Sequence, residues 1–108
     1  MAVTLWHNPR CSKSRAALLY LQDRGLTVDI RLYLKDVPDA AAIAGMLAAL
    51  ALPASKLLRK EGAALAGLPE AQIIAAMVQT PALIERPVIR IGARAVIGRP
   101  TEAIETLL

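Results

Sequence analysis

The spacing of apolar and polar residues divides the chain into short strands and helices. Residues 3–6 form an apolar run that predicts a buried strand, and the Ala- and Leu-rich stretch 14–24 predicts a helix. Gly25 follows as a helix C-terminal residue. Residues 26–33 alternate apolar and polar side chains, which is typical of a half-buried strand. This strand, helix and strand indicate a βαβ unit with parallel strands and a right-handed crossover.

The middle of the chain has a helical pattern. Residues 40–52 carry apolar side chains at i, i+3, i+4 and i+7, and Asp36 or Asp39 can cap this helix. A short second piece begins at Pro53, and a third helix is predicted over residues 69–80. These segments lie between the second strand and the strands that follow.

The C-terminal part returns to strands. Residues 88–91 and 94–97 flank Gly92-Ala93, which predicts a tight β-hairpin. From Thr101 onwards the pattern predicts a last amphipathic helix whose apolar positions are Ile104, Leu107 and Leu108. The whole order predicts one α/β domain over residues 1–108. We expect a thioredoxin/glutaredoxin-like sandwich with a four-stranded mixed sheet and a helical insertion at about residues 36–84.

Composition narrows the function. Apolar residues make up 56% of the chain, but no run approaches the roughly 18 residues that span a bilayer, so no membrane segment is expected. The N-terminus lacks an export signal and there is a single cysteine, which favours the cytoplasm. The net charge of +4 comes from scattered residues, with no basic run and few aromatic residues to stack on bases. Nucleic-acid binding is therefore not expected.

The candidate chemistry lies in residues 6–15, between the first strand and the first helix. This stretch contains the only cysteine, Cys11, and the only histidine, His7, together with three cationic side chains. A helix N-terminus and nearby cations stabilise a thiolate and also form an anion site. A lone cysteine is more often a small buried apolar residue. The polar neighbours favour a reactive thiol here.

Spacing separates this loop from related chemistries. A phosphatase-type or thioredoxin-coupled loop needs Cys-x5-Arg, but the sixth residue after the cysteine is Ala17. A dithiol oxidoreductase needs a second cysteine where Ser14 stands. One cysteine and one histidine do not provide a four-ligand zinc site, so no metal is expected.

Four motifs in this order resemble the glutaredoxin-coupled arsenate reductase family, and the resemblance runs almost end to end. They are residues 7–15 (HNPRCSKSR), 57–60 (LLRK), 85–88 (ERPV) and 98–100 (GRP). The loop Cys-Ser-Lys-Ser is similar to that of the small bacterial arsenate-reductase-like branch.

The resemblance implies a role for each matching residue. Cys11 is the nucleophile that attacks arsenic(V), and His7 and Ser14 favour its thiolate, His7 by positive charge or hydrogen bonding and Ser14 by donating a hydrogen bond. Pro87 matches the cis-proline that faces the cysteine in thioredoxin-like folds. The residues that match the oxyanion-binding arginines are Arg59, Arg86 and Arg99.

The resemblance also implies the reductants. With no resolving cysteine, glutathione as co-substrate supplies the first thiol and glutaredoxin the second, and no tightly bound cofactor is expected. The alternative is a redox-sensing or protein-binding regulator of the same fold, with Cys11 glutathionylated. Arsenate-dependent turnover distinguishes the two.

Overall fold

The computed structural model describes residues 2–108 and contains one mixed sheet of four strands in the order β2-β1-β3-β4. β1 pairs in parallel with β2 and antiparallel with β3, and β3 pairs antiparallel with β4. The mixed sheet and the C-terminal hairpin predicted from the sequence are confirmed. The strands are β1 (Val3–Trp6), β2 (Val28–Arg31), β3 (Val88–Ile91) and β4 (Arg94–Ile97).

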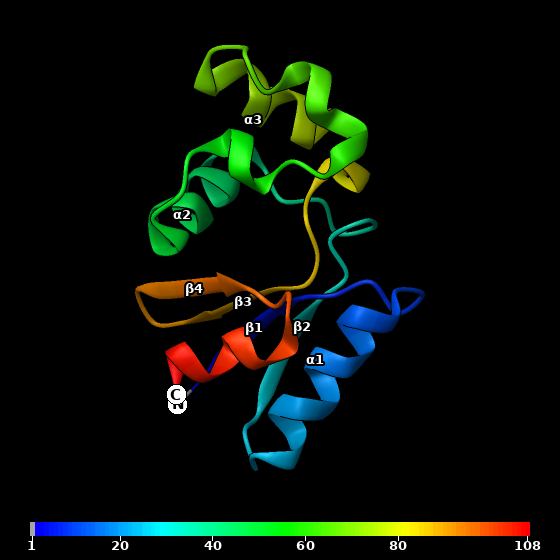
Figure 1. Ribbon diagram of the computed structural model, residues 1–108, viewed down its shortest axis with the longest axis vertical. Helices are drawn as coiled ribbons and strands as arrows, with labels where there is room; N and C mark the ends of the chain where they lie inside the picture. The colour runs from blue at the N-terminus through cyan, green and yellow to red at the C-terminus, as the bar shows by residue number, and fades with distance from the viewer. Residues whose placement is uncertain (1) are drawn as a thin grey trace.

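Helices cover both faces of the sheet (Figure 1). One face carries α1 (Ser12–Asp23) and the 3₁₀ segment η4 (Thr101–Leu107), and the other carries α2 (Ala40–Leu50). α3 (Glu70–Gln79) stacks on α2, farther from the sheet (Figure 1). Within residues 2–108, no helix is long and apolar enough to cross a membrane. The remaining 3₁₀ segments are η1 (Ala54–Leu57), η2 (Lys60–Leu65) and η3 (Pro81–Leu83).

The strand register sorts the apolar side chains between two cores. Leu5 lies opposite Ile89, and both belong to the core under α1 and η4. Trp6 lies opposite Val88, and both belong to the core under α2. Because successive side chains of a strand point to opposite faces, the central strand β1 contributes to both cores. The end of β1 is therefore held firmly from both sides.

The second strand is shorter than its alternating pattern predicts. β2 covers only Val28–Arg31, because the backbone turns at Leu32, whose carbonyl accepts hydrogen bonds from the N–H groups of Lys35 and Asp36. β2 is an edge strand, and Ile30 is 42% exposed. Tyr33 follows the strand and is completely buried.

The helix ends agree with the predicted caps in most places. Gly25 has a φ of 72°, as a left-handed residue after α1. Asp39, rather than Asp36, caps α2 by accepting a hydrogen bond of 2.8 Å from the N–H of Ala42. The last helix is present, but η4 is a 3₁₀ helix and not an α-helix, because its hydrogen bonds run from residue i to residue i+3. Leu108 follows its last turn and is 44% exposed, so it is not a core residue.

Candidate active site

Cys11 lies between β1 and α1, at the N-cap position of the helix, which begins at Ser12. The loop is held by its own backbone: the N–H of Cys11 donates to the carbonyl of Asn8 at 3.0 Å. The N–H of Arg10 donates to Oδ1 of the same asparagine at 3.0 Å. Cys11 is 9% exposed, so its surroundings are largely fixed by the protein. The thiol therefore meets the free N–H groups of the first helical turn.

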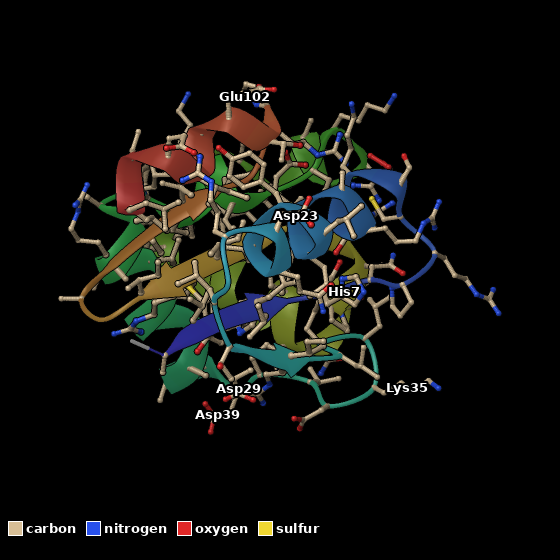
Figure 2. The ribbon with its side chains drawn as sticks, turned by 90° about the horizontal axis from the view of Figure 1, so that it is seen from below. His7, Asp23, Asp29, Lys35, Asp39 and Glu102 are labelled. Atoms are coloured by element: carbon tan, nitrogen blue, oxygen red, sulfur yellow. The ribbon has the colours of Figure 1, made fainter. Side chains whose placement is uncertain are left out.

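His7 and Ser14 form a buried pair beside this loop. His7 Nδ1 and Ser14 Oγ are 2.6 Å apart, and the same Oγ accepts a hydrogen bond of 3.0 Å from the N–H of Asn8. The backbone N–H of His7 donates to the carbonyl of Arg31 at 2.8 Å. Figure 2 shows His7 just past the end of β1 and near the start of α1, with Lys35 pointing outward. This pair connects the β1 end to the first turn of α1.

The structure gives the immediate partners of His7 and Ser14. Burial, and then the positive charge of Arg15, lower the pKa of His7, so the imidazole is neutral near pH 7. Its ring contacts the Ser14 hydroxyl, and that hydroxyl also accepts the hydrogen bond from the N–H of Asn8. A neutral ring that bonds to a serine positions the loop and adds no positive charge to it. The group of Ser14 that favours the Cys11 thiolate is its backbone N–H.

The surroundings of Cys11 favour the thiolate. Burial by itself raises the pKa of the thiol, but the adjacent Arg86 guanidinium lowers it as a hydrogen-bond donor and as a positive charge. The backbone N–H groups of Ser14 and Lys13 lower it further, and the net pKa lies below the ordinary value of cysteine. A lowered pKa increases the fraction of nucleophilic thiolate at neutral pH.

Two of the three predicted arginines surround the thiol. Arg99 donates from a terminal guanidinium nitrogen to Cys11 Sγ at 3.8 Å, and from Nε to the carbonyl of Arg86 at 2.7 Å. The Arg86–Pro87 peptide bond is cis, as the resemblance implies. The Arg99–Pro100 bond is also cis, which was not expected. The two Arg-Pro segments thus lie side by side at the cysteine.

The third arginine lies in an adjoining cleft. Arg59 forms ion pairs with Glu61 at 3.2 Å and with Glu85 at 4.0 Å. Its backbone N–H donates to the carbonyl of Leu83 at 2.8 Å, which ties this segment to the one before Arg86. Arg59 and Arg99 share an open cleft of about 370 Å³, lined by Leu58, Arg59, Lys60, Glu61, Glu85 and Arg99.

The charges around Cys11 suit an anion. Planar guanidinium groups bind tetrahedral oxyanions through paired N–H donors. Among residues 2–108, no three His, Cys, Asp or Glu side chains come together in a way that could hold a metal ion. Two further arginines point elsewhere: Arg90 donates to the carbonyl of Gly92, and Arg94 donates to that of Thr106. They provide natural controls for the three near the cysteine.

Sequence reasoning missed one residue of this region. Tyr33 is completely buried, and its hydroxyl interacts with the charge of Arg86. In the sequence it ends the alternating segment 26–33 and falls at one of its polar positions, so the alternation does not predict that Tyr33 is buried. The remaining signal was its place two residues beyond the end of β2, the strand parallel to the one that leads to Cys11.

Comparison with known proteins agrees with this geometry. An arsenate reductase of Neisseria meningitidis is 34% identical over 114 residues, covering 98% of this chain and 97% of that protein. An arsenate reductase of Haemophilus influenzae is 34% identical over 116 residues and is covered in full, as is this chain. The solved structure of an arsenate reductase from Vibrio cholerae has a TM-score of 0.93 at 31% identity, covering 100% of this chain and 98% of that one.

These likenesses confirm the thioredoxin-like α/β fold predicted from the order of the elements. The sequence resemblance is confirmed as well, because the model that describes the ArsC family matches residues 6–107. The match includes the Cys11 loop and all three arginines. The chain therefore belongs to the ArsC family.

Proposed function

We propose that this protein reduces arsenate to arsenite through the thiolate of Cys11. The observation that carries the proposal is a cysteine with a lowered pKa beside the guanidinium groups of Arg86 and Arg99. The arsenate reductases of Neisseria meningitidis and Haemophilus influenzae, which this chain resembles over its full length, support arsenate as the oxyanion.

The reaction begins with attack by sulfur. The Cys11 thiolate forms an S–As bond with arsenic(V), and one arsenate oxygen leaves as water after protonation. Two external thiols then supply two electrons, arsenic(V) becomes arsenic(III), and the two thiols end as one disulfide. Arsenite dissociates, and Cys11 returns to the thiolate. The guanidinium groups stabilise the negative oxygens during attack.

The electrons come from outside the chain in this proposal. Cys11 is the only cysteine of the sequence, so no internal disulfide can form. We assign the first thiol to glutathione and the second to glutaredoxin. Turnover should therefore require both, and thioredoxin should not replace them.

The arginines provide the binding test. Arg59→Ala, Arg86→Ala and Arg99→Ala should each weaken sulfate binding by about tenfold to a hundredfold, since a charge-assisted hydrogen bond contributes roughly 1.5–3 kcal/mol. Arg90→Ala and Arg94→Ala are matched controls, because these side chains bond to backbone carbonyls away from Cys11. Calorimetry that gives equal losses for all five would contradict a defined oxyanion pocket.

The activity test is a coupled assay with arsenate, glutathione, glutaredoxin, glutathione reductase and NADPH. We expect arsenate-dependent NADPH oxidation that is lost in Cys11→Ser, because a serine hydroxyl is scarcely ionised near neutral pH. Cys11→Ser should still bind sulfate. A protein that forms a mixed disulfide with glutathione at Cys11 but shows no arsenate-dependent oxidation above a blank without protein would be a redox-sensing regulator instead.

A further inference from the structure

The phenol of Tyr33 is a buried polar group that makes no hydrogen bond within the described part of the chain. Tyr33 is 0% exposed, and neither its hydroxyl nor Nε of Arg86 has a hydrogen-bond partner among residues 2–108. Buried polar side chains almost always have partners, because leaving one unpaired destabilises the fold. Two unpaired groups in one place point to a ligand that pairs with them.

The fold places this phenol at the proposed site. β1 and β2 are parallel and end at the same edge of the sheet, where the N–H of His7 bonds to the carbonyl of Arg31. Tyr33 lies two residues farther along, at the edge that also carries the Cys11 loop. It packs in the same core as Trp6, which adjoins His7. The ring is therefore held in the core next to the sheet edge that carries the Cys11 loop.

The segments that carry Arg59 and Arg86 pack in the same core as the Tyr33 ring. Leu57, two residues before Arg59, belongs to it, as does Val88, two residues after Arg86. The charges of Arg86, Cys11 and Arg59 all act on the phenol, so these three groups lie near it. Burial raises the pKa of Tyr33, so the hydroxyl keeps its proton near pH 7 and is a donor.

We propose that the Tyr33 hydroxyl donates a hydrogen bond to an oxygen of the tetrahedral oxyanion held between Cys11 and Arg86. The phenol is then a buried donor of the pocket, whereas Arg99 is exposed to solvent. The hydroxyl has no hydrogen-bond partner within residues 2–108 and gains one when the oxyanion binds. This assignment rests on the proposed function, because it concerns the same substrate.

The test is Tyr33→Phe, which removes only the hydroxyl. Sulfate and arsenate affinities are measured by calorimetry in a Cys11→Ser background, which prevents adduct formation. We expect about a tenfold loss of affinity for both anions, the loss of one hydrogen bond to a charged group. Thermal unfolding without anion should be unchanged or shifted upward, since an unpaired buried polar group is removed. A purely structural hydroxyl would give the reverse: lower thermal stability at unchanged affinity.

Tyr20→Phe is the matched control, because its hydroxyl bonds to Glu105 on the outer surface. It should leave anion affinity unchanged. Arg86→Ala shows whether the pocket exists at all. If Arg86→Ala weakens binding and Tyr33→Phe does not, the assignment of Tyr33 is wrong and the proposed function stands. If the Cys11→Ser protein binds neither sulfate nor arsenate, both proposals are wrong.

Discussion

Gly98 provides a prediction whose size follows from the packing around it. This residue comes directly after β4 and is buried, and its N–H donates to the carbonyl of Pro87 at 2.9 Å. A Cβ atom at this position would lie 2.8 Å from Cδ1 of Ile89 and 3.0 Å from Cγ of Pro87. Ile89 and Pro87 are both buried, so the clash can be relieved only by moving packed neighbours.

Gly98→Ala should therefore destabilise the protein. Forcing one extra carbon into a packed core costs about 1–3 kcal/mol. Each kcal/mol lowers the melting temperature of a domain of this size by roughly 4–8 °C. Urea unfolding at neutral pH measures the free energy, and a scan by circular dichroism measures the melting temperature. The variant also moves Pro87 relative to Arg99, so sulfate affinity should fall with stability.

Gly67→Ala is the control. A Cβ at Gly67 would have no atom within 4 Å, so the substitution adds no clash. Replacing a glycine at a compatible position usually stabilises by about 0.4–1 kcal/mol through the unfolded chain. Equal unfolding free energies for the Gly98 and Gly67 variants would refute the reasoning from packing.

Three further outcomes follow from the site and from one helix cap. Arg86→Gln should raise the pKa of Cys11, because burial then acts with less opposition; the pH dependence of thiolate ultraviolet absorbance measures this, and an unchanged midpoint would contradict it. Because the pKa of His7 is lowered in the fold, the unfolded chain binds the proton more tightly and stability falls as the pH drops below 6.5. The urea midpoint of His7→Gln should fall less than that of the wild type as the pH is lowered below 6.5. An equal fall in both proteins would contradict the assignment to His7. Asp39→Ala should cost about 1 kcal/mol of unfolding free energy through the lost α2 cap, and Asp39→Asn much less.

Local patterns predicted much of the architecture. The alternation and apolar runs located all four strands, and Gly25 and Asp39 marked helix ends correctly. The position of Cys11 before a helix followed from the strand–turn–helix order alone. Each of these features depends on neighbours in sequence, and so the sequence is sufficient to predict it.

The site contacts depend on residues far apart in the chain. Nothing near Arg59 in sequence distinguishes it from a surface arginine, and its ion pair with Glu85 exists only because the fold brings two segments together. The buried phenol of Tyr33 looks like one more strand position. The resemblance implied that His7 and Ser14 favour the thiolate, but the sequence does not reveal that the His7 ring pairs with the Ser14 hydroxyl or that the Ser14 group acting on the thiol is its backbone N–H.

The β1–β3 pairing has a consequence for synthesis of the chain. Cys11 leaves the ribosome well before β3, and 88 residues before Arg99. Until β3 inserts beside β1, the thiol lacks both guanidinium groups that lower its pKa or contact it. The nascent cysteine therefore lacks these contacts, and its full reactivity begins only after the segments that carry Arg86 and Arg99 have been synthesised.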